Sequence, residues 1–226
     1  MLASCRAVDW DKRNAPQRMS QYNTTPSIWT YCDDALKNTY SNLRPYQMRV
    51  SDSTTNNIYL KALGISSELI TARGLIAFKE ATTLESAEIG VDGRDHLLIL
   101  TAAEAWRNLK ATAHSDGIDL FIISAFRSIE RQAEIVRRKL DAGMAIEDIL
   151  TSCAPPGFSE HHTGCAVDLS TPGSHALEIE FDESAAYAWL NKYAFEFGYY
   201  LSYPIGNPWG YQYEPWHWCF KNISEP

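Results

Sequence analysis

Short apolar and alternating runs predict strands along the chain after residue 57. Five stretches have the composition of short strands: 75–78, 118–124, 164–170, 199–203 and 216–220. Residues 96–100, after an expected turn at 90–95, form either a short strand or the approach to a helix. The run 118–124 is β-branched and apolar, which predicts a central strand. In 164–170 small and polar residues alternate with Cys, Val and Leu, so we expect the apolar side chains to be buried and Asp168 to face a cleft.

Apolar side chains at helical spacing predict three helices, over about 101–114, 128–142 and 182–197. Thr101 and Glu104 have the form of a capping box, in which each side chain satisfies a backbone N–H of the first turn. Ser128 and Asp182 are expected to cap the other two helices. The expected helix ends are Gly117, Gly143 and Gly198.

The apolar residues among the first 57 positions follow neither helical spacing nor strand alternation. The segment is rich in Asn, Ser, Thr and Gln, and aromatic side chains are scattered along it, at Tyr22, Trp29, Tyr31, Tyr40 and Tyr46. We expect residues 1–57 to form an N-terminal extension packed on a core domain of residues 58–226, with one helix near 33–42.

Length and charge narrow the classes of function. A chain of 226 residues can bury a substantial core without oligomerising, so a monomer or small homo-oligomer is expected. The chain carries 20 basic and 28 acidic residues, a net charge of −8, without a Lys/Arg cluster. This balance argues against nucleic acids and anionic membranes as partners.

Cysteine usage bears on the compartment. The five cysteines, an odd number, form no CxxC pair: Cys5, Cys32, Cys153, Cys165 and Cys219. Reduced thiols in the cytoplasm fit this pattern, and no apolar run approaches the roughly 18 residues of a membrane span. The start of the chain lacks a signal pattern, although residues 2–5 resemble the tail of a lipoprotein signal, so a periplasmic location is expected if a signal segment was removed.

Two segments carry residues with catalytic potential: 157–168 and 213–218. The first holds His161 and Asp168, seven positions apart, and the second holds Glu214 and His217, three apart. Two imidazoles and one carboxylate can hold a catalytic zinc ion with an open position, while a second carboxylate takes the proton of a water molecule. The alternative is a polar loop that leads into an ordinary edge strand.

Arg127 lies between the end of an expected strand and the start of an expected helix. Such a position can direct a side chain into a cleft held by two rigid elements. The alternative is a surface arginine.

These motifs resemble a known family. Ser159-x-His161-x-x-Gly164-x-Ala166-x-Asp168, followed by Glu214-Pro-Trp-His217, resembles the signature of the VanY-like D-alanyl-D-alanine carboxypeptidases. Residues 124–128 and 130–132 resemble the upstream arginine motif of the same family. The resemblance covers about residues 95–220 and implies an α+β fold of the LAS/Hedgehog type, with a central antiparallel sheet flanked by helices. Phe126 departs from the family pattern, in which a tyrosine is common.

The resemblance also implies roles for single residues. It implies three Zn2+ ligands, His161, Asp168 and His217. Glu214 would be the catalytic base, and Arg127 would bind the substrate and steady the oxyanion. Ser159 and Gln132 would help to hold the peptide.

The remaining histidines and one cysteine receive structural interpretations. His162 is expected to be a neighbour of the site and Cys165 a small buried residue, although a thiolate beside a metal could also bind it. The other histidines, His96, His114 and His175, have no ligand spacing and are expected at the surface.

The leading functional hypothesis is a zinc carboxypeptidase that trims peptidoglycan stem peptides. In the cytoplasm, an L,D-carboxypeptidase acting on recycled tetrapeptide muropeptides is favoured, since D,D-cleavage there would attack wall precursors. In the periplasm, D,D-carboxypeptidase action on pentapeptides would be favoured instead.

Three other interpretations remain open. A Hedgehog-type binding module would use zinc only structurally, but a spare Glu214 has little purpose there. A non-haem iron oxygenase also uses two His and one carboxylate, but with a His and carboxylate two positions apart. An endopeptidase on the same scaffold differs only in how the groove is closed.

Overall fold

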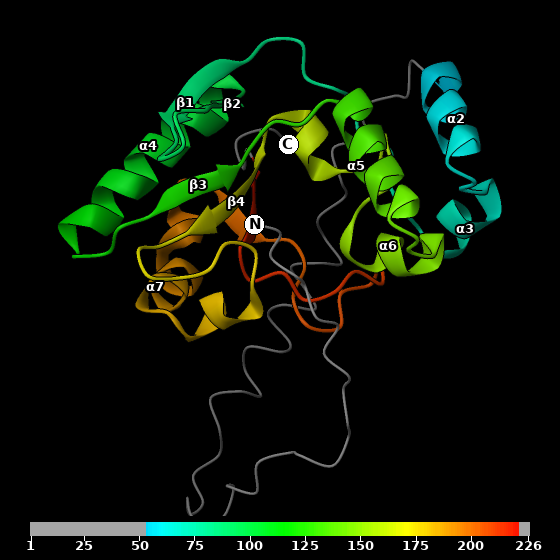
Figure 1. The fold of residues 1–226 in the computed structure, drawn as a ribbon. Coiled ribbons are helices and arrows are strands. Elements are labelled where there is room, and N and C mark those ends of the chain that lie inside the picture. The colour runs from blue at the N-terminus through cyan, green and yellow to red at the C-terminus, as the bar shows by residue number, and fades with distance from the viewer. Residues whose placement is uncertain (1–52, 222–226) are drawn as a thin grey trace, which may run out of the picture. The chain divides into compact units, whose positions relative to one another are not determined.

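A computed structural model describes residues 53–221, with side chains from residue 58. In chain order its elements are α2 (Ser53–Ala62), α3 (Ser67–Ala72), β1 (Glu85–Ile89), β2 (Asp95–Leu98), α4 (Leu100–Ser115), β3 (Phe121–Ser124), α5 (Ile129–Asp141), α6 (Ile146–Ser152), η1 (Glu160–Thr163), β4 (Ala166–Ser170), η2 (Ile179–Glu183), α7 (Ala185–Tyr193), η3 (Ala194–Phe197), β5 (Tyr199–Leu201) and β6 (His217–Phe220) (Figure 1). The predicted helix near 33–42 lies outside the described residues. The proposed domain boundary at residue 57 falls inside α2.

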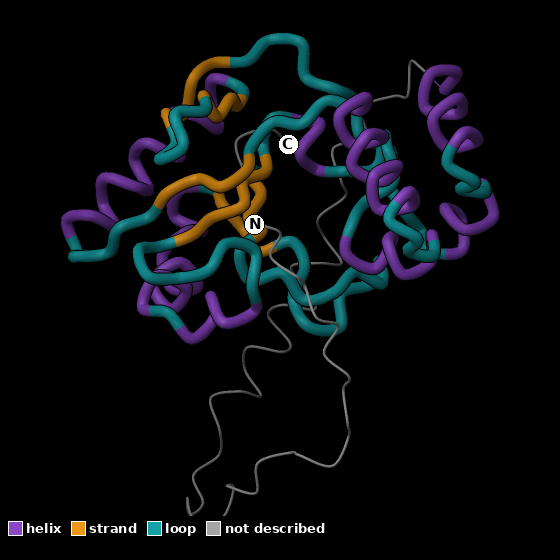
Figure 2. Tube along the Cα trace, viewed as in Figure 1, coloured by secondary structure: helices purple, strands orange, loops and turns teal. Residues whose placement is uncertain are grey.

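The strands form two antiparallel sheets. Four pair in the order β3-β4-β6-β5, and β1 and β2 form a separate hairpin around the turn predicted at 90–95. Helices surround the larger sheet (Figure 2), and the strands of both sheets pair antiparallel, which confirms the α+β fold class. The prediction of a central strand at 118–124 is wrong in position: β3 is an edge strand. The middle places belong to β4 and β6, and every residue of β4 is buried.

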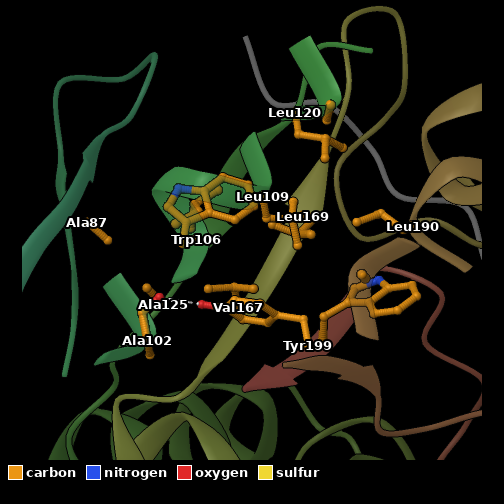
Figure 3. Close-up of a cluster of buried hydrophobic side chains, with 14 of the residues drawn as sticks. Ala87, Ala102, Trp106, Leu109, Leu120, Ala125, Val167, Leu169, Leu190 and Tyr199 are labelled. Atoms are coloured by element: carbon orange, nitrogen blue, oxygen red, sulfur yellow. Dashed lines mark hydrogen bonds between the residues drawn. The ribbon is translucent and has the colours of Figure 1, made fainter. Parts of the chain in front are cut away.

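One hydrophobic core joins the sheet to α4 and α7. Trp106 and Leu109 of α4 are fully buried and pack with Val167 and Leu169 of β4 (Figure 3). The hydroxyl of Tyr199 donates a 2.9 Å hydrogen bond to the carbonyl of Ala102, which ties β5 to α4. The helix α4 therefore anchors the strand that carries Asp168.

A second core holds the helices α2, α3, α5 and α6 together. Val136 of α5 packs with Ile149 and Leu150 of α6, all essentially unexposed. Ser128 caps α5 as predicted, since its hydroxyl accepts from the N–H of Arg131 at 3.0 Å. This helix forms one wall of the cavity described below.

Two predicted caps are wrong. Helix α4 begins at Leu100 with Ile99 as its N-cap and no side-chain cap bond, because β2 runs to Leu98 and leaves no room for a cap at Thr101. Asp182 lies within η2, and Ser184 caps α7 instead by accepting from the N–H of Tyr187 at 3.1 Å. The predicted ends at Gly117, Gly143 and Gly198 are confirmed, each with a positive φ.

The prediction of a strand at 75–78 is also wrong. Residues 75–80 form an irregular segment. Two isolated backbone hydrogen bonds tie this part of the chain to the loop around His162. The N–H of Phe78 donates to Gly157 O, and the N–H of Ala81 donates to His162 O, both at 2.8 Å. Isolated bonds to a loop fix a segment in place without making a ladder.

No helix in the described range 53–221 has both the length and the apolar character that crossing a bilayer requires.

Candidate metal centre

The 3-10 turn η1 positions His161, the first of the predicted ligands. Ser159 caps the 3-10 turn η1, and Gly164 ends it in the left-handed region at φ 67°. A Cβ on Gly164 would lie 2.8 Å from a methyl carbon of Leu84, so the close packing as well as the backbone requires glycine here. His161 is thereby held directly before β4.

The three predicted ligands come together at the middle of the sheet. Asp168 of β4 and His217 of β6 are directly opposite each other in the antiparallel register. His161 Nε2 lies 3.2 Å from Asp168 Oδ2, and His217 Nδ1 lies 3.0 Å from Asp168 Oδ1. One ligand atom from each residue lies within 4.8 Å of the others, and all three residues are buried. This is the donor set and spacing of a three-residue zinc site.

Hydrogen bonds to the outer ring atoms orient the two imidazoles. His161 Nδ1 donates to the carbonyl of Ala125 at 2.7 Å, which leaves Nε2 as the unprotonated atom that faces Asp168. The two imidazole rings meet edge to face, with centroids 4.9 Å apart, and Tyr203 lies over His217 at 4.6 Å. These contacts fix the orientation of both rings.

The electrostatics of the triad favour a cation. Burial opposes ionisation of Asp168, but the neighbouring His161 and His217 hold its pKa well below the usual range. Burial also opposes protonation of His217, yet the carboxylates of Asp168 and Glu160 raise its pKa to about 10. A place where carboxylates hold an imidazolium this firmly is one where a divalent cation fits.

Glu214 lies beside the triad without belonging to it. Its Oε2 is 3.9 Å from His217 Nδ1, and its side chain is 14% exposed. Backbone bonds from Glu214 N to Tyr203 O and from His217 N to Glu214 O, both 3.1 Å, fix the turn that presents it. Burial raises the pKa of Glu214 to about 7, a value suited to accepting and returning a proton near neutrality.

Arg127 reaches the same place from the junction of β3 and α5. Its Nη2 lies 3.6 Å from Asp168 Oδ2 and donates to Ser124 Oγ at 2.8 Å, while Nη1 donates to Gln132 Oε1 at 3.0 Å. Its backbone N–H also donates to His161 O at 3.1 Å. The guanidinium is thus fixed at the site rather than placed freely on the surface.

The two predicted peptide-binding residues have different surroundings. Ser159 lines the cavity and is 4% exposed, and its hydroxyl accepts a 3.4 Å bond from the N–H of His161. Gln132 has no exposed surface, and its amide is engaged by Arg127, by the carbonyl of Ala154 at 2.6 Å and by Cys153 Sγ at 3.1 Å. In this structure Gln132 supports Arg127 from behind.

The site opens into a cavity of about 420 Å³, which lies in the size range of small-molecule and peptide sites. The triad, Arg127, Ser159 and Glu214 lie in its wall together with Trp216, Lys139 and Leu177. Trp216, which directly precedes β6, thus adds a large aromatic side chain to this wall.

The other histidines play structural parts. His162 is fully buried; its Nε2 accepts from Gly157 N at 3.1 Å and its Nδ1 donates to Arg127 O at 2.6 Å, so neither nitrogen is free for a metal. His114 and His175 are exposed as predicted, but His96 is only 6% exposed, because it packs against Gly90 inside the hairpin turn. Cys165 lies partly buried outside the triad.

Comparison with known proteins identifies the family. Residues 95–223 match the family model VanY, D-alanyl-D-alanine carboxypeptidase. The chain belongs to the VanY family.

Two of the relatives by sequence are carboxypeptidases of enterococci. This VanY-family chain is 31% identical over 128 residues to a D-alanyl-D-alanine carboxypeptidase of Enterococcus faecalis, covering 52% of this chain and 46% of that protein. It is 29% identical over 118 residues to a D-alanyl-D-alanine carboxypeptidase of Enterococcus faecium, covering 51% of this chain and 34% of that protein. The chain therefore spans less than half the length of these relatives.

Solved structures support the same fold. The LD-carboxypeptidase LdcB superposes with a TM-score of 0.57 at 26% identity, covering 62% of this chain and 69% of that chain. VanYB in complex with D-alanine-D-alanine gives a TM-score of 0.50 at 27% identity, covering 66% of this chain and 82% of that chain. The expected LAS/Hedgehog-type zinc peptidase fold is confirmed.

Sequence reasoning missed two polar residues of this VanY-type site. Glu160 accepts from His217 Nε2 at 3.0 Å, and Lys139 reaches the cavity from α5. Glu160 stands next to His161 in the motif, which is a signal of proximity, but nothing in the sequence indicates that it meets a residue 57 positions later.

Proposed function

We propose that this chain is a zinc-dependent carboxypeptidase that removes the terminal D-alanine from peptidoglycan stem peptides. The observation that carries the proposal is the meeting of the His161–Asp168–His217 triad with Glu214 and Arg127 in one cavity. Family membership and a relative described as a VanY D,D-pentapeptidase mutant in complex with Zn(II), 27% identical with a TM-score of 0.51, support it.

The residues of the chain divide the chemistry between them. Zinc, when bound by the triad, supplies a Lewis acid and lowers the pKa of a coordinated water to about 7. Glu214 accepts the proton of the attacking water and passes it to the leaving amine of D-alanine. Arg127 offers fixed positive charge where the carbonyl oxygen becomes negative. The reaction needs no covalent enzyme intermediate.

We propose further that the preferred substrate is a tetrapeptide, cleaved as an L,D-carboxypeptidase. In a tetrapeptide the residue before the terminal D-alanine is a diamino acid with a long side chain. The cavity extends along α5 to Lys139, which lies seven residues, about 10 Å of helix, beyond Gln132. Lys139 is partly buried, and within residues 58–221 no carboxylate pairs with it at salt-bridge distance. A substrate with a second carboxylate, as in diaminopimelate, would supply that partner.

Replacing Lys139 by alanine is expected to raise KM roughly tenfold for a diaminopimelate tetrapeptide, since a charge-assisted hydrogen bond contributes about 1.5 kcal/mol at its lower end. The measurement compares tetrapeptides that differ only in the third residue: diaminopimelate, amidated diaminopimelate or lysine. Arg138→Ala, an exposed neighbour on α5, is the control. An equal loss on all three peptides would show that Lys139 binds the terminal carboxylate, and no loss on any would remove it from substrate binding.

A cytoplasmic location is proposed with the L,D assignment. The three cysteines of the described residues are free thiols, Cys153, Cys165 and Cys219, as suits a reducing compartment.

Muropeptide digestion followed by mass analysis, together with metal analysis of the purified protein, tests the proposal. Loss of alanine from tetrapeptides supports L,D cleavage. Loss only from pentapeptides would replace it with D,D cleavage, the alternative that the similarity to VanYB favours. Cleavage inside the stem peptide would indicate an endopeptidase, and zinc binding without any cleavage would indicate a Hedgehog-type binding module.

Replacing Arg127 by lysine is expected to lower kcat by about 10²–10³-fold, the usual effect of removing one oxyanion donor. Lysine keeps the charge but loses the planar fork that bonds Ser124 and Gln132 at once. Steady-state kinetics on tetrapeptide measure the effect, with Arg131→Lys on the exposed face of α5 as the matched control. An unchanged kcat would show that Arg127 does not stabilise the negative charge that develops on the carbonyl oxygen.

A further inference from the structure

We propose that Glu160 is a positioning residue that fixes His217 as a metal ligand through Nδ1. The inference rests on the proposed zinc site but concerns a residue that takes no part in the peptide chemistry itself. The supporting observation is that each of the two ring nitrogens of His217 contacts a different carboxylate.

The ring of His217 is held by a different carboxylate at each nitrogen. Nδ1 lies 3.0 Å from Asp168 Oδ1, and Nε2 lies 3.0 Å from Glu160 Oε2. Both contacts are sheltered, with the side chains of His217 and Glu160 3% and 14% exposed. An imidazole in such a place can direct only one nitrogen at a metal ion.

The geometry assigns Nδ1 to the metal side. Asp168 is shared between His217 Nδ1 and His161 Nε2, and the proposed base Glu214 also approaches Nδ1, at 3.9 Å. The opposite nitrogen, Nε2, faces Glu160 alone. Glu160 is absent from the residues that line the cavity, so it acts through His217 rather than on a substrate.

The carboxylate of Glu160 determines which nitrogen of His217 carries the proton. A neutral imidazole carries one N–H, and the nitrogen that binds a metal must be the other one. An ionised carboxylate can only accept, so Glu160 holds the N–H on Nε2. A metal ion bound at the triad would take the place of the proton on the other nitrogen, and Nδ1 would then offer the ion its lone pair. Such partners of ligating histidines fix the tautomer and the ring orientation and raise the basicity of the ligand; their removal weakens metal affinity by about 10–100-fold.

The local structure keeps Glu160 in register with the site. It is the first residue of η1, directly before the ligand His161, and Thr163 Oγ1 donates to its carbonyl at 2.6 Å. One turn of chain therefore supplies both the first ligand and the carboxylate that orients the third. Tyr203, whose ring lies tilted over that of His217 with centroids 4.6 Å apart, limits rotation of the imidazole away from Glu160.

Zinc affinity and the tautomer of His217 test the inference without reference to catalysis. Zinc binding is measured by competition with a chelating dye for the wild type, Glu160→Ala, Glu160→Gln and the exposed control Glu196→Ala. We expect a 10–100-fold weaker affinity for Glu160→Ala, a smaller loss for Glu160→Gln because its amide oxygen still accepts, and no change for the control. Long-range ¹⁵N–¹H NMR of the zinc-loaded wild type is expected to show the His217 proton on Nε2.

Wild-type zinc affinity in Glu160→Ala would overturn the inference, as would a His217 proton on Nδ1 with zinc on Nε2. If Glu160→Ala does not fold, the Glu160→Gln affinity and the wild-type NMR spectrum still decide. A protein that binds zinc in this way yet cleaves no stem peptide would refute the proposed function and leave the role of Glu160 standing.

Discussion

Glu214→Gln is expected to lower kcat on stem peptides by about 10²–10⁴-fold while zinc remains bound, because proton transfer by a positioned carboxylate contributes about that much. Glutamine keeps the size of the side chain and cannot accept a proton. The triad does not include Glu214, whose carboxylate lies 3.9 Å from His217 Nδ1, so the ligands stay in place. Kinetics on tetrapeptide and zinc content by mass spectrometry measure the two effects together.

The matched control is Glu183→Gln, an exposed carboxylate of η2. It should behave as the wild type in both measurements. If Glu214→Gln kept its kcat, another group would have to take the water's proton. If it lost zinc as well as activity, Glu214 would be a ligand rather than the base.

The site was largely predictable because its information is local. His161 and Asp168 share one short segment, and period-two alternation correctly placed Val167 and Leu169 in the core. The position of Arg127 at the junction of a strand and a helix was predicted from the end of one apolar run and from the cap of the next helix, which Ser128 provides. Each of these signals depends on neighbours a few residues away.

The missed features depend on distant partners. Strand composition does not reveal order in a sheet, so an apolar β3 was expected in the middle while pairing put it at the edge. Helices α3 and α6, of 6 and 7 residues, are too short to be stable alone and form because their apolar side chains pack into the second core. The contact between Glu160 and His217 is the same kind of case.

The two cores explain why the site lies where it does. One core fixes β4 through α4, and the other fixes α5 through α6, so the cavity lies between elements that are each supported from behind. Asp168 lies on β4, which the first core fixes, and Lys139 lies on α5, which the second core fixes. Rigid elements of this kind hold catalytic groups more accurately than loops do.

Asp168→Asn is expected to abolish zinc binding at micromolar metal and to lower kcat/KM by on the order of 10³-fold or more. Metal-ion polarisation of the carbonyl supplies several kcal/mol, and each 1.36 kcal/mol is a factor of ten in rate. Asparagine has the same shape, but its amide can offer only one oxygen where the carboxylate now serves His161, His217 and Arg127. Zinc titration and tetrapeptide kinetics measure the loss.

The same substitution should also destabilise the protein without metal. Asp168 is 4% exposed and is a buried counter-charge of the His217 imidazolium and the Arg127 guanidinium, so its neutralisation leaves part of that positive charge unpaired, at a cost of about 3 kcal/mol. For a chain of this size that lowers Tm by roughly 6–12 °C. Asp119→Asn, which removes only an exposed pair with His114, is the control and should lower Tm very little. Chelator-treated wild type separates the two effects: it should match Asp168→Asn in activity but unfold at a higher temperature, and equal unfolding temperatures would mean that the carboxylate matters to this fold only through the metal.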